Sequence, residues 1–219
     1  DRNKEIVKYE TLMRIRDIDE NEKVIYFTPN LFLSVSFKTK QYLQLSHIII
    51  SKTFDNLLKT KKQISLNISF KDILNNEFIE FLDNKMDRLE KKDKQRIIFE
   101  ILESDYISDY EHLEEFISKY KKHGVKIAID DFGTGYSNFI RIMRIRPDYL
   151  KIDSSLIKYI DIDKNSYEIV KSIIAFSKAL NIKTIAEYVH TKEILDLLLE
   201  MGVDEFQGFY LGEPSLNIE

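Results

Sequence analysis

The sequence predicts an α/β fold of repeated strand and helix units that curls into a (β/α) barrel. Short β-branched runs alternate seven times with longer segments whose apolar residues recur at three and four, which favours parallel units in a doubly wound sheet or a barrel. Polar residues also gather at the carboxyl ends of these strands, where barrel enzymes carry their chemistry. Seven strand ends converge on one pocket only in a barrel, so we expect a barrel, one strand short of the usual eight.

The expected strands are, in chain order, residues 5–12, 64–69, 96–102, 126–130, 148–153, 182–187 and 203–209. Four segments between them have helical spacing of apolar residues: 39–59, 76–92, 109–124 and 165–181. Gly124 and Asn181 close two of these helices as left-handed C-caps, and Thr191 is the candidate N-cap of a further one.

Composition predicts a single domain over residues 1–219. The chain has 43% hydrophobic residues, enough for one sizeable core, and no Pro, Gly or Ser-rich linker divides it. The net charge of -4 gives no basic field, so we expect no nucleic acid partner. The absence of cysteine excludes disulfides, thiolate zinc sites and cysteine nucleophiles, and favours a reducing compartment.

Membrane contact is not expected from this chain either. No apolar run approaches the roughly 18 residues that a spanning helix needs, and residues 1–15 do not resemble a signal peptide. We therefore expect a cytoplasmic domain, tethered to a membrane only if a region outside this chain provides the anchor.

The candidate site comes from the polar strand ends, which are Glu10, Asn67, Glu100, Asp130 with Asp131, Lys151 with Asp153, Glu187 and Gln207. Each has an ordinary explanation when taken singly, as an exposed strand residue or a turn former. Jointly they favour a site, because a parallel strand buried on both faces should be almost continuously apolar. Two adjacent carboxylates also repel one another unless a cation lies between them or they share a proton.

Carboxylates with one amide oxygen form a ligand set for Mg²⁺ or Mn²⁺. Two ions roughly 3.5 to 4 Å apart would share it, with Asp130 bridging and Asp131 serving the second ion, an arrangement suited to phosphoester chemistry. Lys151 would orient or help to deprotonate water, or neutralise phosphate charge, unless it only balances Asp153. Arg14 could hold a phosphate as a bidentate fork, or be one of several surface arginines.

Several strings resemble one known family. "IDDFGTGYSNF", followed by "LKID", "AE" and "QGFYLGEP", closely resembles the EAL-domain cyclic diguanylate phosphodiesterases. The name-giving motif reads Glu10-Thr11-Leu12, with Arg14 at the family's phosphate-binding arginine. The Asn-x-Ser motif is 67–69, and E-x-T-E is 100–103. The resemblance implies a TIM-like (β/α) barrel of the EAL type. The family's strand before the E-A-L strand has no match upstream of Glu5, so we expect that first strand to be missing from this chain.

The resemblance also implies the site. Metal ligands would be Glu10, Asn67, Glu100, Asp130, Asp131 and Glu187; Lys151, Glu187 and Asp130 would be catalytic; Arg14, Gln207 and Leu12 would contact substrate. Glu103, Gly133 and Gly135 would stabilise the loop 131–137, which links the site to a dimer interface. The implied reaction is hydrolysis of cyclic di-GMP to linear pGpG with two Mg²⁺ or Mn²⁺ ions, in bacterial second-messenger signalling. Implied partners are a second copy of the chain and an upstream sensory or GGDEF-type domain in a longer multidomain protein.

The sequence departs from the family's motifs at three positions, and two functions other than cyclic di-GMP hydrolysis remain as alternatives. Thr11 replaces Ala, Leu102 replaces Thr, and His190 replaces the second glutamate of an E-x-x-E motif. His190 could be a metal ligand, a phosphate contact or a plain loop residue, the last being slightly favoured. The other functions are a catalytically inactive cyclic di-GMP sensor, and a barrel enzyme that uses Lys151 as base with one magnesium on a carbonyl substrate.

Overall fold

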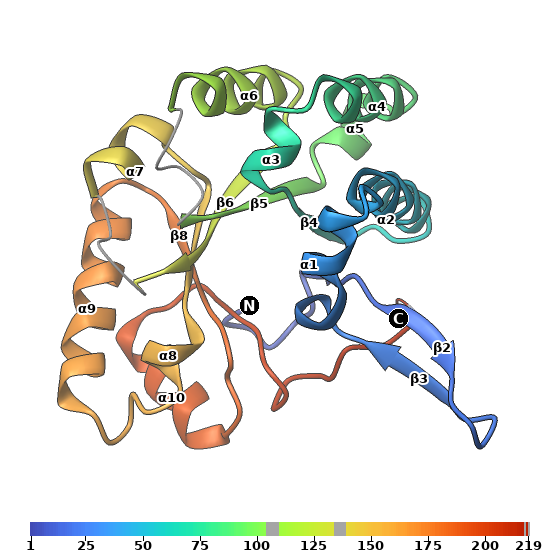
Figure 1. The fold of residues 1–219 in the computed structure, drawn as a ribbon. Coiled ribbons are helices and arrows are strands. Elements are labelled where there is room, and N and C mark those ends of the chain that lie inside the picture. Colours follow the sequence, from blue (N-terminus) through green and yellow to red (C-terminus); the bar gives the residue numbers. More distant parts are fainter. Residues whose placement is uncertain (104–109, 134–138, 217, 219) are drawn as a thin grey trace.

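The computed structural model describes residues 1–103, 110–133, 139–216 and 218. Seven parallel strands form one sheet in the order β1-β4-β5-β6-β7-β8-β9. This sheet curls into a half-barrel with helices outside it (Figure 1), so the predicted (β/α) barrel architecture with seven strands is confirmed. The strands are β1 Lys8–Thr11, β4 Gln63–Asn67, β5 Ile97–Leu102, β6 Lys126–Phe132, β7 Tyr149–Ile152, β8 Lys183–Ala186 and β9 Glu205–Phe206.

All seven expected strands are present, but several boundaries were wrong. The expected strand 5–12 pairs only over Lys8–Thr11, and 203–209 shrinks to Glu205–Phe206. β6 instead runs past Asp130 to Phe132. Strand ends depend on the neighbouring strand that supplies hydrogen bonds, and single-strand patterns do not contain that information.

The helices are α1 Pro29–Lys38, α2 Tyr42–Leu57, α3 Phe70–Ile73, α4 Asn76–Asp87, α5 Lys91–Lys94, α6 Tyr110–Lys122, α7 Phe139–Ile145, α8 Ser154–Ile157, α9 Lys164–Ala179 and α10 Lys192–Met201. The helix expected over 76–92 ends at Asp87, and the short helix α5 begins at Lys91 and continues beyond the expected range. The predicted caps are confirmed: Gly124 and Asn181 have φ of 89° and 56°, and Thr191 accepts the Ile194 N–H at 3.2 Å. Of the helices in the described residues, none combines the length and apolar character that crossing a bilayer requires.

An antiparallel hairpin that the sequence reading missed follows β1. It consists of β2 Ile15–Ile18 and β3 Val24–Phe27, and it projects away from the half-barrel (Figure 1). Ile18, Val24 and Tyr26 are exposed, so the hairpin leaves no core-facing periodicity in the sequence.

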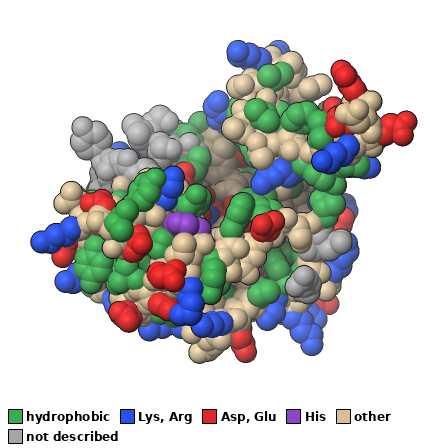
Figure 2. Space-filling view, turned by 90° about the horizontal axis from the view of Figure 1, so that it is seen from below, with side chains coloured by type: hydrophobic (Ala, Val, Ile, Leu, Met, Phe, Trp, Pro, Cys, Tyr) green, Lys and Arg blue, Asp and Glu red, His purple; other side chains and the backbone are tan. Residues whose placement is uncertain are grey.

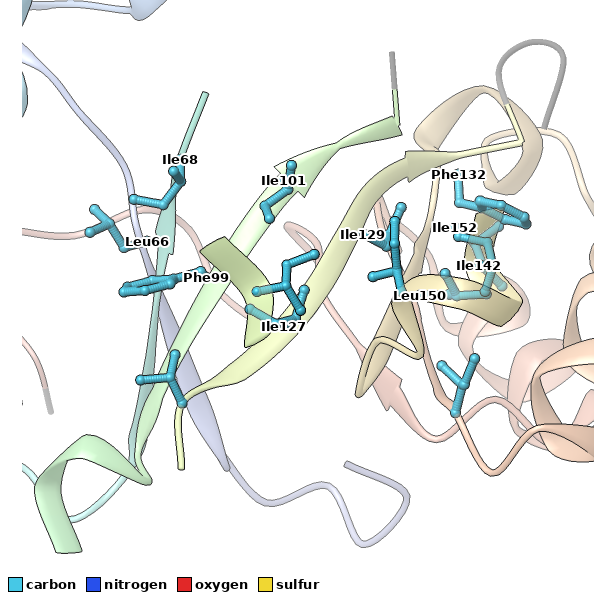
Figure 3. Packing of buried hydrophobic residues seen from close by; sticks show 14 of the residues in the cluster. Leu66, Ile68, Phe99, Ile101, Ile127, Ile129, Phe132, Ile142, Leu150 and Ile152 are labelled. Carbon is cyan, nitrogen blue, oxygen red and sulfur yellow. The ribbon is translucent and has the colours of Figure 1, made fainter. Parts of the chain in front are cut away.

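The main core lies between the outer face of the sheet and the helices. This cluster (Figure 3) contains Leu66, Phe99, Ile101, Ile127, Ile129, Phe132, Leu150 and Ile152 of the strands, Ile68 directly after β4, and Ile142 of α7. Side chains alternate between the two faces of a strand, so the residues between these ones face the barrel interior.

The two edges of the sheet meet through side chains. In the described residues, β1 and β9 pair with β4 and β8 but not with one another. Lys8 of β1 forms a 2.6 Å ion pair with Glu205 of β9, and both side chains are largely buried. We call this opening between β1 and β9 the seam. Figure 2 shows one face of the molecule, hollowed near its centre and covered by a mixture of apolar, basic and acidic side chains.

Candidate metal centre

The barrel interior has two levels, and the candidate residues form the upper one. A lower apolar cluster contains Ile98, Ala128, Tyr149 and Ile185, one residue from each of four consecutive strands. Two positions later in the chain come Glu100, Asp130 and Lys151, still within their strands, and Glu187, the residue directly after β8. Because side chains repeat every second residue, these four point to the same interior, one level nearer the carboxyl edge. By the same spacing from Lys8, Ser65 and Glu205, β1 adds Glu10, β4 adds Asn67, and Gln207 follows directly after β9.

Lys151 is the centre of the pocket. Its ammonium is 2.6 Å from Glu100, 2.9 Å from Asp130, 2.9 Å from Glu187 and 3.6 Å from Glu10. The side chain is 1% exposed, so it interacts with carboxylates rather than with water. The expected alternative, a lysine that only balances Asp153, is wrong, because Asp153 caps α8 through the Ser155 N–H at 2.8 Å.

Glu10 connects the edge strands at this level. Its Oε1 accepts a 3.0 Å hydrogen bond from Asn67 Nδ2, and its Oε2 accepts a 2.6 Å bond from Gln207 Nε2. The Asn67 amide oxygen is thereby left for another partner, which suits a cation ligand. Gln207 and Glu10 also bridge the seam, above Lys8 and Glu205.

A bulge in β6 explains how two adjacent aspartates serve one pocket. The pairing of β6 with β7 shifts register between Ile129 and Phe132. Strict alternation would put Asp131 in the outer core, but the fully buried Phe132 takes that place. Asp131 has φ 55°, and its N–H donates to Asp130 Oδ1 at 3.1 Å. The extra residue therefore re-aims the second carboxylate, as bulges beside active sites do.

The described structure brings the six predicted ligands together in two groups. Carboxylate oxygens of Asp130, Asp131 and Glu187 lie within 4.8 Å of one another, a spacing that could hold a metal ion. Glu10 and Glu100 contact Lys151, which also contacts Asp130 and Glu187, and Asn67 is bonded to Glu10.

Burial and mutual repulsion alter the acidity of the pocket. Burial is the main cause that raises the pKa of Glu187 to about 8, of Glu100 to about 7 and of Asp131 to about 6, with neighbouring carboxylates adding to it. Burial opposes the charge of Lys151, but the surrounding carboxylates outweigh it and raise the lysine pKa well above its ordinary value. Burial also opposes the charge of Glu10, yet Lys151 and the two amide donors lower its pKa.

The donor set fits divalent cations. Four carboxylates contact the Lys151 ammonium and Asp131 lies beside two of them, which leaves four negative charges when all five are ionised, and two dications would match them. The donors are all oxygen, as Mg²⁺ and Mn²⁺ prefer. The raised pKa values report the burial of these carboxylates and, to a lesser extent, their mutual repulsion, and bound dications would offset both.

The loop residues agree in part with expectation. Glu103 accepts the Gly133 N–H at 3.2 Å, and Gly133 has φ 105°. A side chain at 133 would also meet Leu156 Cδ1 at 2.6 Å, so this position requires glycine. Gly135 lies outside the described residues.

Among the described residues, three more residues from the sequence analysis contact other parts of the chain than the carboxylates. They are Arg14, Leu12 and His190. Arg14 donates to the Met13 carbonyl at 2.8 Å, and Leu12 is 38% exposed. His190 is exposed, with Nδ1 3.0 Å from the Tyr188 carbonyl and its ring 5.0 Å from the Tyr188 ring. That position favours the interpretation of His190 as a plain loop residue over a metal ligand or a phosphate contact.

Sequence reasoning missed Gly208. A Cβ there would lie 2.2 Å from the Val189 carbonyl oxygen, so the backbones of the two segments after β8 and β9 touch. Val189 N–H donates to Gln207 at 2.9 Å across this contact. The glycine of "QGF" is the signal that the sequence offers for this contact, although it lies in the expected strand 203–209.

The curled parallel sheet and the acidic pocket at its carboxyl edge define a (β/α)-barrel protein with a site suited to divalent cations. A family model described as EAL domain matches residues 1–214, and the chain belongs to this family.

Among curated relatives, cyclic di-GMP phosphodiesterase PdeF of Escherichia coli K12 is 28% identical over 214 residues, covering 95% of this chain and 28% of the relative. PdeA of Borreliella burgdorferi is 37% identical over 121 residues, 55% of this chain and 18% of the relative. The chain thus spans less than a third of these relatives. A solved structure described as "PaMucR Phosphodiesterase, c-di-GMP complex" superposes with TM-score 0.84 at 28% identity, covering 96% of this chain and 85% of that one. The Bacillus subtilis YkuI protein with c-di-GMP and calcium gives 0.81 at 26%, covering 98% and 52%.

Proposed function

We propose that this chain hydrolyses one phosphodiester bond of cyclic di-GMP to give linear pGpG, using two Mg²⁺ or Mn²⁺ ions. The observation that carries this proposal is the ring of carboxylates around Lys151, with Asp131 beside it. Relatives named cyclic di-GMP phosphodiesterases, and a related structure solved with c-di-GMP and calcium, support the substrate and the cation class.

In this mechanism Asp130, Asp131 and Glu187, together with Glu10, Asn67 and Glu100, would hold the cations. The ions, when bound, would supply an activated water and polarise the phosphoryl oxygen. Lys151 keeps its proton, because the surrounding carboxylates raise its pKa, so it neutralises developing negative charge rather than accepting a proton. That preference argues against the carbonyl-substrate alternative. Arg14, Leu12 and Gln207 remain the proposed substrate contacts.

The partners belong to the same proposal. We place residues 1–219 as one domain of a longer signalling protein, since the curated relatives are much longer and one is named as a bifunctional diguanylate cyclase and phosphodiesterase. A homodimer would use α7, where Phe139, Ile140 and Met143 are exposed, and the segment 154–180. If the chain stays strictly monomeric at high micromolar concentration with metal and substrate present, the proposed homodimer is wrong.

Incubation with cyclic di-GMP and each metal, followed by chromatography of the products, tests the reaction. Asp130→Asn should abolish turnover because the bridging position loses its charge, while the circular dichroism spectrum and melting temperature stay close to those of the parent. Asp83→Asn, on α4, is the control and should remain active. Turnover of Asp130→Asn at the parent rate would contradict the two-metal reaction. Binding of cyclic di-GMP by the parent chain without linear product would instead identify the sensor alternative.

A further inference from the structure

A buried carboxylate that is not among the predicted metal ligands lies on α3, the helix that follows β4. Asp72 of α3 is 3% exposed. Its Oδ2 accepts three hydrogen bonds: from the Ser69 N–H at 2.9 Å, the Ser69 hydroxyl at 2.7 Å and the Tyr42 hydroxyl at 2.7 Å. A buried carboxylate is retained only when donors satisfy it, so three donors on one oxygen mark a defined arrangement.

Part of this arrangement is a helix cap. The Asp72 N–H donates back to the Ser69 hydroxyl at 3.2 Å, which completes a capping box at the start of α3. The cap fixes the turn that follows β4. Asn67 is the last residue of β4, two positions before Ser69.

Tyr42 is not needed for that cap. It comes from α2, and its ring stacks on Phe37 of α1 with centroids 4.0 Å apart. Its hydroxyl ties these two helices to the carboxylate of α3 by a bond to a charged acceptor, which is stronger than a neutral one. The turn after Asn67 is therefore stabilised both by its own capping box and by the hydrogen bond from Tyr42 of α2.

The other side of the turn is held by the sheet. Ile68 N–H donates to the Glu100 carbonyl at 2.8 Å, and Asn67 itself is exposed, with one side-chain bond to Glu10. The amide of Asn67 thus has little packing of its own. Its direction depends on the backbone between β5 on one side and Ser69, Asp72 and Tyr42 on the other.

We propose that Tyr42 and Asp72 are positioning residues, which aim the Asn67 amide oxygen at a divalent cation. This inference rests on the metal centre of the proposed function and adds two residues to it. Neither residue touches the cation. Outer partners of metal ligands typically change metal affinity by about 10- to 100-fold when removed, and a partner acting through a backbone turn should have a smaller effect.

Mn²⁺ alone is the probe, and free Mn²⁺ is measured by electron paramagnetic resonance during titration of the whole chain. Tyr42→Phe should weaken Mn²⁺ binding about three- to tenfold, and Asp72→Asn should weaken it at least as much. Excess Mn²⁺ should restore most of the turnover of Tyr42→Phe, with KM for cyclic di-GMP unchanged.

Tyr120→Phe is the matched control. The Tyr120 hydroxyl also donates to an aspartate, Asp83, at 3.0 Å, and the residue is fully buried on α6. Its removal should lower the melting temperature at least as much as Tyr42→Phe does, yet leave Mn²⁺ binding unchanged.

Coincident Mn²⁺ curves for the parent, Tyr42→Phe and Asp72→Asn would overturn the inference, as would a parent chain that binds no Mn²⁺. A parent chain that binds Mn²⁺ but forms no pGpG would overturn the proposed function, and the same curves would still decide the role of Tyr42 and Asp72.

Discussion

The protons held by the pocket should make cation binding depend on pH. The pKa of Glu187 is raised to about 8 and that of Asp131 to about 6, chiefly by burial, so both carboxyl groups bind protons that a cation must displace. Below each pKa the proton competes with the metal, and above it the competition ends. Apparent Mn²⁺ affinity should therefore rise between about pH 6 and pH 8, where Glu187 and Glu100 lose their protons, and level above pH 8, while Asp131 adds to the rise only below about pH 6; each displaced proton contributes up to about tenfold per pH unit. Titrations at fixed ionic strength would test this, and a flat profile over that range would contradict it.

Glu187 and His190, three residues apart, should differ sharply in their effects on turnover. Glu187 contacts Lys151 at 2.9 Å, whereas the His190 ring lies against Tyr188. Glu187→Ala should be close to inactive, and His190→Ala should lose less than about tenfold, a barrier change under roughly 1.4 kcal/mol. Rates at saturating Mn²⁺ would measure both. A loss in His190→Ala as deep as that of Glu187→Ala would show that the histidine has a catalytic duty.

For individual residues, the sequence predicted which side chains form the pocket better than it predicted their geometry. Glu100, Asp130, Lys151 and Glu187 could be found because a buried parallel strand has no other reason to carry charge at those positions. The positive φ of Asp131 could not be found, since it depends on a register shift against β7. Tyr42 and Asp72 were missed for a similar reason: they are 30 residues apart and meet only in the folded chain.

Among the elements, the contact between the segments after β8 and β9 should tolerate no side chain. Gly208→Ala would place a methyl group 2.2 Å from the Val189 carbonyl oxygen, and backbone cannot move aside as a flexible side chain can. We expect a loss of about 2 to 4 kcal/mol in the free energy of unfolding. Gly212→Ala is the control, because nothing lies within 4 Å of a Cβ there. Urea unfolding of the two variants gives the comparison, and equal stabilities would show that the backbones separate easily.

The elements with core-facing periodicity were predictable, and those without it were not. The strands of the half-barrel and α2, α6 and α9 carry apolar stripes that pack on the sheet. The β2–β3 hairpin has exposed apolar residues, and α4 ends at Asp87 although the helix was expected to continue to residue 92. Local spacing does not report such breaks, because tertiary packing decides them.

For the whole molecule, the seam should depend on its buried ion pair. Glu205→Met would leave the Lys8 ammonium without its 2.6 Å partner in a largely buried place, and we expect a loss of about 2 to 3 kcal/mol in the free energy of unfolding. Lys8→Met combined with Glu205→Met should recover much of that loss, since no uncompensated charge remains. Asp196→Asn, which breaks the exposed pair with Lys192, is the control and should cost under about 1 kcal/mol. A double variant less stable than the single one would contradict this account.

The seam also connects the edge of the sheet to the chemistry of the pocket. In the described residues, no backbone hydrogen bond joins β1 to β9, so their separation is set by Lys8 with Glu205 and by Glu10 with Gln207. Glu10 is at once a candidate cation ligand and one of these four residues. A cation that draws Glu10 away from Gln207 therefore changes the favoured spacing of the two edges. The coupling between cation binding and the distance from β1 to β9 works in both directions. A further segment that pairs with β1 or β9 and favours one distance between them must change the cation affinity of the pocket. The free energy of that change equals the free energy by which the cation alters the binding of the segment.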